Sequence, residues 1–528
     1  MTKTTSTLFL LAALLFLFAL NSYQLRSSTE PRVAGAATEM LIYRDWVVPR
    51  LNGAPFLEKP PLSLWLDSAA MRLFGITPMA ARLASALAGV ATALVVFWSL
   101  LRWRRPRGEA LLAGVLLITM AAYWSNARQV GEDALLTLGT TLALTAYFSA
   151  VRRHGARNWL LFALGIAIAT MSKGVLGLAL TGVVIFAWLV VTTMQTQRFT
   201  VGDWLRPALA TLLGLVPLAL WLFALYRQGG ADAVAEIILS NSVGRFAGDF
   251  ENGGHFEPFY YYLAKLPEIF QPWTVLALLG LWAALRKAAS DRAALFLSCW
   301  ILAPFVLLSL SSGKRMVYLL AIYPAAAILA AHYCGDLWRR FIAHDDGAAR
   351  VLRVLSWLYA LVLSALAIAL TATLVKHKAS PLATAVAALA LLLGCIALWR
   401  ALRHREYAGV AAACAAIMSV AYLSYAALVL PAQDRKETFQ PLFAELQALK
   451  NSGHEIALYQ PSERLAGATV FYTASKAPVL HSAEELEAYF ATGNAVATLE
   501  AGVMPALHNA KVLETFSIGK RDYYIVGR

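Results

Sequence analysis

Charged residues are scarce in this chain: Asp, Glu, Lys and Arg make up 14% of its 528 residues, whereas hydrophobic residues make up 59%. A typical soluble domain has about 25% charged and about 45–50% apolar residues. The composition therefore excludes an ordinary soluble protein and favours a chain that buries most of its surface in lipid. At about 20 residues per span, its length accommodates roughly a dozen membrane spans and one small soluble domain.

Cysteine is also rare, and the four cysteines are Cys299, Cys334, Cys395 and Cys414. They lie far apart, inside or at the end of apolar runs, and no Cys-x-x-Cys motif occurs. This spacing signals neither a disulfide framework nor a zinc knuckle. We interpret all four as small core side chains.

The net charge of +14 comes from short clusters of Lys and Arg between apolar runs. That distribution is typical of the positive-inside rule and argues against nucleic-acid binding. Clusters such as 102–107, 152–157 and 286–292 follow even-numbered runs, whereas the loops after odd-numbered runs carry fewer cations. We therefore expect a multi-pass membrane protein with a cytoplasmic N-terminus and a C-terminal tail outside the cytoplasm.

Thirteen apolar runs are long enough to predict about thirteen spans, although a short one such as 158–171 could belong to a merged or re-entrant pair. The first run also has features of a signal peptide, but we expect an uncleaved anchor that holds the following loop at the bilayer. The runs cover residues 7–22, 82–101, 109–124, 134–151, 158–171, 174–194, 205–225, 270–286, 293–311, 316–335, 354–375, 382–400 and 409–430.

The pattern divides the chain into a transmembrane domain, residues 1–430, and a soluble domain outside the cytoplasm, residues 431–528. The first domain has two large outer loops, 23–80 and 227–268. The tail alternates strand-like with helix-like runs, which predicts a small α/β domain. The strand-like runs are 456–459, 468–472 and 523–526, and the helix-like runs are 437–450 and 483–491.

The first outer loop is the most informative stretch. Residues 33–41 have helical spacing, which fits an amphipathic helix at the membrane interface. Glu58 and Lys59 then precede Pro60 and Pro61, which stiffen the backbone and fix where the two charges point. The alternative is an ordinary surface loop, but ionisable residues beside a membrane favour a functional site.

Three further charged stretches are expected at outer helix mouths. Asp133 follows Glu132 at the start of a span, where one carboxylate could instead cap the helix. His255, alone, would be a surface residue, but together with Glu58 it could hold a divalent cation, zinc or magnesium/manganese. Lys314 and Arg315 follow a glycine, as suits a clamp for phosphate.

In order, these stretches resemble one family, the polytopic C-type glycosyltransferases that use polyprenyl-phosphate sugars. The similarity is greatest to lipid A aminoarabinose transferases and the protein O-mannosyltransferase group. It covers about residues 5–430. The matching pattern runs through Glu30-Pro-Arg-Val-Ala-Gly, Glu39-Met-Leu, Asp45-Trp-Val-Val-Pro, Asn52-Gly, Glu58-Lys-Pro-Pro, Asp133-x-x-Leu-Thr, Lys173-Gly, His255-x-x-Pro and Gly313-Lys-Arg.

The resemblance implies transfer of a hexose or pentose from a polyprenyl (undecaprenyl) phosphate donor to a lipid, glycan or protein acceptor, by one inverting displacement. Asp133 is the candidate general base. The candidate clamps for the donor phosphate are Lys59, Arg245, Lys314 and Arg315. The resemblance also implies a bacterial inner membrane, with the active site and the C-terminal domain in the periplasm. We expect a monomer among membrane lipids.

One departure from the family concerns the catalytic acids. Thr29 stands where the family has an Asp, beside Glu30. Either Glu30 shares the catalytic duty with Asp133, or the acceptor needs little activation. The alternative function is a flippase or transporter of lipid-linked sugars. It would favour ionisable residues at mid-membrane and internal repeats, neither of which the sequence shows. The clustered charges give little support to a structural scaffold.

Overall fold

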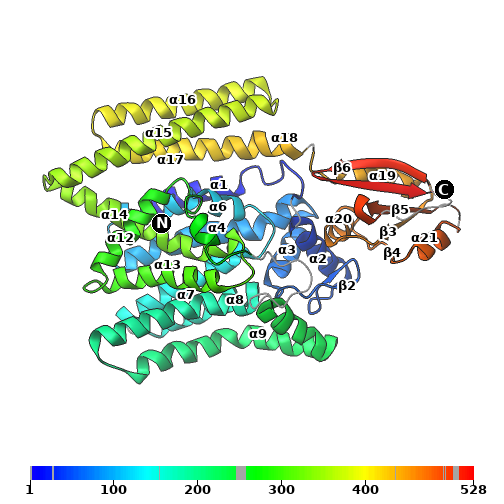
Figure 1. The fold of residues 1–528 in the computed structure, drawn as a ribbon, viewed down its shortest axis with the longest axis horizontal. Coiled ribbons are helices and arrows are strands. Elements are labelled where there is room, and N and C mark those ends of the chain that lie inside the picture. The colour runs from blue at the N-terminus through cyan, green and yellow to red at the C-terminus, as the bar shows by residue number, and fades with distance from the viewer. Residues whose placement is uncertain are drawn as a thin grey trace. The chain divides into compact units, whose positions relative to one another are not determined.

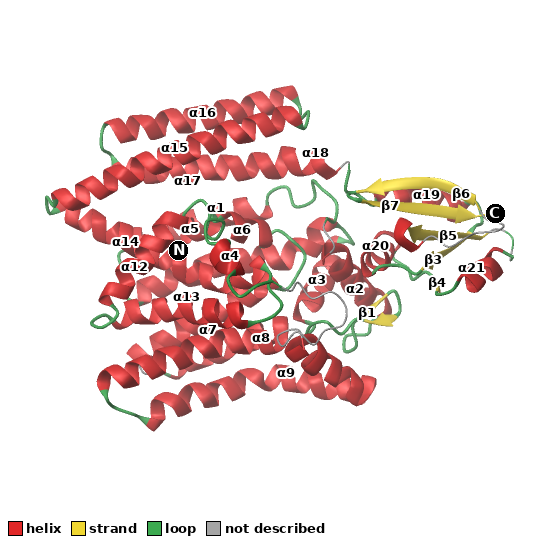
Figure 2. Ribbon diagram, in the orientation of Figure 1, coloured by secondary structure: helices red, strands yellow, loops and turns green. Residues whose placement is uncertain are grey.

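The computed structural model describes residues 3–26, 29–153, 155–244, 257–434, 436–491, 493, 495–503 and 511–527. Helices predominate among these residues, whose strands lie in the first outer loop and in the tail (Figures 1 and 2). The chain folds as two compact units. The helical unit comprises residues 1–18, 58–62 and 85–425, and the mixed unit comprises residues 19–57, 63–84 and 426–528.

The helical unit is a bundle of long apolar helices. Among the described residues of the chain, nine helices are long and apolar enough to cross a membrane. The elements are α1 Lys3–Leu17, α4 Pro78–Arg102 (which begins in the mixed unit), α5 Arg107–Ile118, α6 Ala121–Asn126, α7 Asp133–Arg152, α8 Ala156–Thr196, α9 Val201–Ala235, η1 Glu236–Gly244, α11 Tyr261–Ala264, α12 Thr274–Lys287, α13 Arg292–Leu310, η2 Met316–Ile322, α14 Tyr323–Ile342, α15 Asp346–Lys376, α16 Pro381–Arg403 and α17 Tyr407–Ser424.

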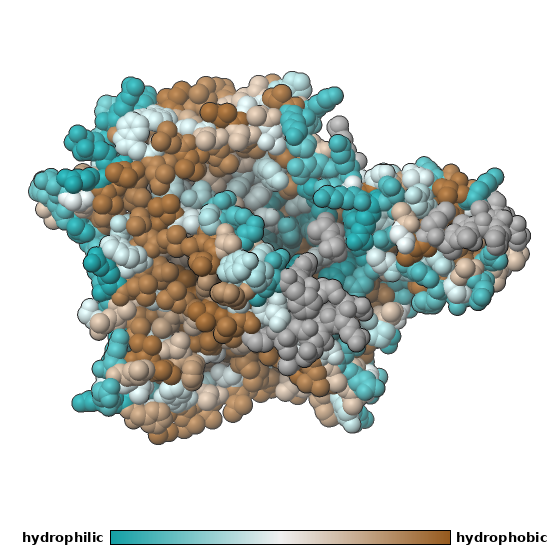
Figure 3. All heavy atoms as spheres, viewed as in Figure 1, coloured by the Kyte–Doolittle hydropathy of each residue, from teal (hydrophilic) through white to brown (hydrophobic). Residues whose placement is uncertain are grey.

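The predicted helical polytopic class is confirmed, whereas the number of thirteen spans stays a prediction. Two predicted runs, 158–171 and 174–194, form one long helix, α8, which is interrupted where Lys173 and Gly174 leave helical geometry. The flanks of the bundle expose large apolar side chains, for example Leu212 and Phe223 of α9. Figure 3 shows the same property as broad brown surfaces over the helical unit. Exposed apolar flanks are what a lipid-facing bundle requires.

The mixed unit contains α2 and α3 from the first outer loop and a five-stranded sheet. Its elements are α2 Thr29–Tyr43, β1 Arg50–Leu51, β2 Ala54–Pro55, α3 Leu62–Phe74, η3 Tyr425–Val429, α18 Leu430–Asp434, α19 Gln440–Asn451, β3 Glu455–Tyr459, α20 Glu463–Thr473, β4 Val479–Leu480, α21 Ala483–Phe490, β5 Ala495–Glu500, η4 Ala501–Val503, β6 Lys511–Ile518 and β7 Arg521–Gly527.

The sheet has the order β4-β3-β5-β7-β6. Strand β3 is parallel to β4 and β5, whereas β7 is antiparallel to β5 and β6. One face packs on α19 and α20 through Leu442 and Leu465, and another cluster packs α21 through Leu486 and Phe490. The predicted α/β character of the tail is therefore confirmed.

One predicted strand is wrong, because residues 468–472 belong to helix α20. Ser462 caps that helix by accepting a hydrogen bond from the Leu465 N–H at 3.3 Å. The run is apolar on successive positions because α20 is buried on several sides, and a short buried helix cannot be distinguished from a buried strand by periodicity.

Helix α2 confirms the helical spacing of residues 33–41, and it packs closely on α20. A Cβ added to Gly35 would lie 2.5 Å from the carbonyl oxygen of Gly467. Only glycine at these positions allows the two backbones to approach so closely. The first outer loop and the C-terminal tail are thus packed together in one unit.

Candidate functional site

The centre of the candidate site is the start of helix α7 in the helical unit. Glu132 is the N-cap residue of α7, and Asp133 is its first residue. The helix dipole favours negative charge at this end. Neither side chain is exposed, with 13% and 17% of the two side-chain surfaces accessible. Two adjacent, largely buried carboxylates need a cationic partner.

That partner is Lys173, at the break in helix α8. Its side chain is 4% exposed, and its Nζ lies 3.4 Å from Glu132 Oε1 and forms a second ion pair with Asp133 Oδ1. The Nζ also lies 5.0 Å from the ring centroid of Tyr318 in η2, within the range of a cation–π contact. One ammonium thus joins both carboxylates and an aromatic ring.

Close packing of α7 on α8 brings these side chains together. A Cβ on Gly139 would lie 2.5 Å from the Ala169 nitrogen, and a Cβ on Gly165 would lie 2.4 Å from the Ala143 nitrogen. Small residues at such contacts are how membrane helices approach backbone to backbone. Lys173 lies one turn beyond Ala169 in α8, so this close packing places its side chain at the first residue of α7, Asp133.

Two more cations act on the acidic pair. Burial alone would raise the pKa of Glu132, but the ammonium groups of Lys173 and Lys59 outweigh it and lower this pKa to about 2. Arg315 exerts an attractive Coulomb interaction on Asp133. The mouth of α7 is therefore a cluster of two acids and three cations, with Glu132 ionised at neutral pH.

Of the predicted phosphate clamps, Lys59 is half-buried and donates from Nζ to the carbonyl oxygen of Glu58 at 3.0 Å. Arg315 is also half-buried, and its backbone is held on both sides by the Tyr262 hydroxyl, at 3.2 Å from its nitrogen and 3.0 Å from its oxygen. The Lys59 ammonium and the Arg315 guanidinium thus act on the two carboxylates at the start of α7.

Lys314 is placed differently, because its side chain is buried and binds backbone. Its Nζ donates to the carbonyl oxygen of Glu257 at 2.8 Å and to that of Ser311. Burial lowers the pKa of Lys314. The contacts tie the segment before η2 to the one before α11, so Lys314 orders the loops around Arg315.

Glu30 lies in the mixed unit and is buried, 2% exposed, in helix α2. Its two oxygens accept hydrogen bonds from Arg82 Nε and Nη2, each at 2.8 Å, and one also accepts from the Arg26 N–H at 2.7 Å. Thr29 begins the same helix. Glu30 is thus built into the interior of its unit.

Arg245 and His255 lie outside the described residues. In the part of the chain that the structure describes, no group of three or more His, Cys, Asp and Glu side chains could hold a metal ion. The predicted ligand Glu58 is half-buried next to Lys59 in residues 58–62 of the helical unit.

Sequence reasoning missed the two residues that complete the cluster. The sequence predicts only that either Glu132 or Asp133 could cap the helix, and it gives Lys173 only as part of the family pattern. A usable signal existed, since Lys173 is the one charged residue between Arg157 and Arg198 and lies where two apolar runs meet. An ionisable residue at such a position favours a functional site.

Several known proteins resemble this chain in sequence or in fold. Residues 4–228 match the family model described as dolichyl-phosphate-mannose-protein mannosyltransferase. The chain is 32% identical over 381 residues to an undecaprenyl phosphate-α-4-amino-4-deoxy-L-arabinose arabinosyl transferase from Pectobacterium carotovorum, covering 70% of this chain and 65% of that protein. The chain is thus similar to these transferases over part of its length.

A second relative has the same name and matches a shorter part of the chain. The transferase of Erwinia tasmaniensis is 30% identical over 325 residues, which cover 61% of this chain and 57% of that protein. The matched part of this chain thus spans less than two thirds of the length of these C-type glycosyltransferases.

The fold matches over a longer range. The crystal structure of ArnT from Cupriavidus metallidurans bound to undecaprenyl phosphate superposes with a TM-score of 0.76 at 21% identity, covering 98% of this chain and 97% of that one. The C-type glycosyltransferase fold is therefore shown for the whole multi-pass chain.

Proposed function

We propose that this protein transfers a sugar, a pentose or a hexose, from undecaprenyl phosphate to an acceptor outside the cytoplasm. Lipid A, another glycan and protein are the candidate acceptors. The observation that carries the proposal is the acid–lysine–acid cluster of Glu132, Lys173 and Asp133, with Lys59 and Arg315 beside it. It lies in a chain whose relatives are named as undecaprenyl-phosphate sugar transferases.

In the proposed reaction, an acceptor oxygen attacks the anomeric carbon as the bond from that carbon to the lipid phosphate breaks. The configuration inverts, the acceptor proton goes to Asp133, and the phosphate leaves with the bonding electron pair. Lys59 and Arg315 stabilise the charge that grows on the leaving phosphate. Arg245, and Lys314 with its remaining N–H, are further proposed phosphate contacts.

The ion pair with Lys173 sets the state of the base. In the free protein, the ammonium of Lys173 pairs with the Asp133 carboxylate. The positive charge favours the ionised form of this largely buried carboxylate. A donor phosphate that attracted Lys173 would leave Asp133 available to the acceptor. Lys173 therefore couples arrival of the donor to activation of the base. We further propose that Glu30, alone among the predicted catalytic acids, acts by ordering the first outer loop.

The proposal also includes the orientation of the chain in the membrane. The mouth of α7, the first outer loop and the C-terminal α/β domain would face the periplasm, with the N-terminus in the cytoplasm. The positive clusters after even-numbered runs support this orientation. Labelling of single cysteines on the two faces of intact cells would test it.

The test of function uses protein reconstituted in liposomes with a radiolabelled undecaprenyl-phosphate sugar and each candidate acceptor. Asp133→Asn and Lys59→Ala should each reduce transfer by roughly 100-fold or more, the usual effect of losing an acid–base or electrostatic group. Asp203→Asn is the matched control, because Asp203 is exposed in the first turn of α9.

Full transfer by both Asp133→Asn and Lys59→Ala would place the active site elsewhere. Movement of the labelled donor across the bilayer without transfer to any acceptor would support a flippase instead.

We also propose a divalent cation, zinc, magnesium or manganese, held by Glu58 and His255. A carboxylate with an imidazole is a ligand pair that these ions accept, and water or substrate would complete the shell. Metal analysis of purified protein should show less bound metal in Glu58→Gln and in His255→Ala than in Glu257→Gln. Equal metal content in all three variants would remove the cation from the proposal.

A further inference from the structure

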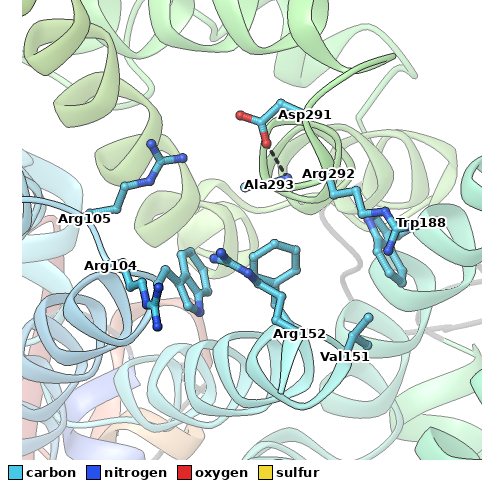
Figure 4. A pocket seen from close by; sticks show the side chains of 10 residues that line it. Arg104, Arg105, Val151, Arg152, Trp188, Asp291, Arg292 and Ala293 are labelled. Atoms are coloured by element: carbon cyan, nitrogen blue, oxygen red, sulfur yellow. Dashed lines mark hydrogen bonds between the residues drawn. The ribbon is translucent and has the colours of Figure 1, made fainter. Parts of the chain in front are cut away.

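A second charged feature lies at the other end of helix α7. A cavity of about 600 Å³ opens between the C-terminal ends of α4 and α7 and the N-terminal end of α13. Four arginines line it, as Figure 4 shows: Arg104, Arg105, Arg152 and Arg292. A cavity of this size at helix ends suits a small ligand or a headgroup.

The polar groups of this cavity are almost all donors. Arg104, Arg152 and Arg292 form no ion pair with any residue that the structure describes. Arg105 lies 3.9 Å from Glu109 and is thus partly committed. Asp291 is the one acid among the lining residues, and its Oδ1 accepts hydrogen bonds from the N–H groups of Ala293 and Ala294.

The wall adds one donor without a partner. Trp188 lines the cavity, is 3% exposed, and its indole Nε1 has no hydrogen-bond partner among the described residues. By contrast, the indole of Trp103, on the same wall, donates to Ser149 Oγ at 3.0 Å. A buried N–H without a partner costs free energy, so the site favours a ligand that accepts hydrogen bonds.

The position of the cavity relates it to the membrane. Helix α7 runs from Asp133 to Arg152 over 20 residues. At 1.5 Å per residue this is about 30 Å, the thickness of the hydrocarbon core of a bilayer. We therefore expect the arginines and tryptophans at the headgroup level of the membrane face opposite the acidic cluster.

We propose that this cavity binds the phosphate headgroup of an anionic phospholipid. Guanidinium groups bind phosphate oxygens in pairs, and basic pockets between membrane helices are where such headgroups are recognised. The apolar walls of Trp103, Phe148 and Trp188 would contact the glycerol and the first methylene groups. This site takes no part in the proposed transfer and does not depend on it.

The test compares lipids that differ in headgroup charge. Full-length protein in detergent is mixed with equal amounts of phosphatidylglycerol and phosphatidylcholine, and the lipid retained is measured by native mass spectrometry. The wild-type protein should prefer phosphatidylglycerol. The double variant Arg104→Gln, Arg292→Gln should lose about thirtyfold in that preference, since each arginine near an anionic headgroup contributes roughly fivefold.

Arg153→Gln is the matched control, because Arg153 neighbours Arg152 but does not line the cavity. It should keep the preference. Equal losses in the control and the double variant would overturn the proposal in favour of diffuse surface charge. Absence of any headgroup preference in the wild-type protein would overturn it outright.

Two further arms complete the experiment. Trp188→Phe keeps the packing but removes the indole donor, and it should weaken retention of phosphatidylglycerol severalfold. It also provides a readout if the double arginine variant does not fold, and unchanged retention would contradict the assigned site. Inorganic phosphate should compete only weakly. Complete displacement of the lipid by phosphate would make a soluble anion the ligand and overturn the lipid proposal.

Discussion

Arg82 donates from Nε and Nη2 to the two carboxylate oxygens of Glu30, each at 2.8 Å, and both side chains are buried. Arg82 Nη1 donates to the carbonyls of Leu20 and Tyr23, and Nη2 also donates to that of Gln24. All five N–H donors of the guanidinium are thus used. The pair fixes the chain just before the first outer helix.

Replacing Glu30 by Gln should therefore destabilise the mixed unit. The substitution leaves the buried guanidinium without its counter-charge, which typically costs about 3–5 kcal/mol. The expected result is a marked fall in the midpoint of thermal unfolding. The control is Glu463→Gln, which breaks the more exposed pair with Arg32 and should cost less than about 1 kcal/mol. Loss of transfer activity with unchanged unfolding would instead make Glu30 a chemical participant.

Replacing Lys173 by Met should abolish most transfer. The change leaves Glu132 and Asp133 adjacent and without their shared cation, so one carboxylate must take up a proton. We expect transfer to fall by about 100-fold or more. Lys173→Arg should retain more activity, because it keeps the charge but alters the geometry. Lys287→Met, at an exposed pair with Asp336, is the control and should leave transfer unchanged.

Stability should depend on the ionisation of Glu132 in a defined pH range. Its pKa is about 2 in the folded protein against an ordinary value of 4.5, so its contribution is complete above pH 4.5 and is lost as the pH falls toward 2. The difference in unfolding midpoint between the wild-type protein and Glu132→Gln should shrink over this range. A constant difference down to pH 2 would show that Glu132 is not held in its charged form.

Adding one methyl group at Gly467 should separate α2 from α20. The new Cβ would lie 2.3 Å from the Pro31 carbonyl oxygen and 2.8 Å from the Arg32 Cα, so the helices must move apart. Overpacking of this kind costs about 1–3 kcal/mol. Gly502→Ala is the control, because its Cβ would meet nothing within 4 Å. Limited proteolysis should cleave the Gly467→Ala protein faster, and equal rates would contradict the tight contact.

The sequence predicted the features that depend on local pattern. The apolar runs, the helix at residues 33–41 and the acid at the start of α7 follow from hydropathy and spacing alone. The partners of the acids could not be predicted in this way. Lys173 is 40 residues from Asp133, and their meeting depends on how α7 and α8 pack.

For the same reason the surroundings of Glu30 could not be predicted from the sequence. The Glu30 carboxylate pairs with Arg82, which is 52 residues away near the start of α4. Backbone carbonyls that no motif records hold the Arg82 guanidinium in place. A carboxylate in a family pattern looks the same in the sequence whether it faces substrate or holds an arginine.

The contact of α2 with α20 also sets an order of events during synthesis. The mixed unit joins residues 19–57 and 63–84 to residues 426–528, and the helical unit is encoded almost entirely between them. Chains emerge and fold from the N-terminus. Helix α2 therefore leaves the ribosome early but obtains its packing partner only when the last fifth of the chain has been made. The first outer loop reaches its final form after the membrane helices, so a chain still being synthesised has an unfinished loop beside its first helix.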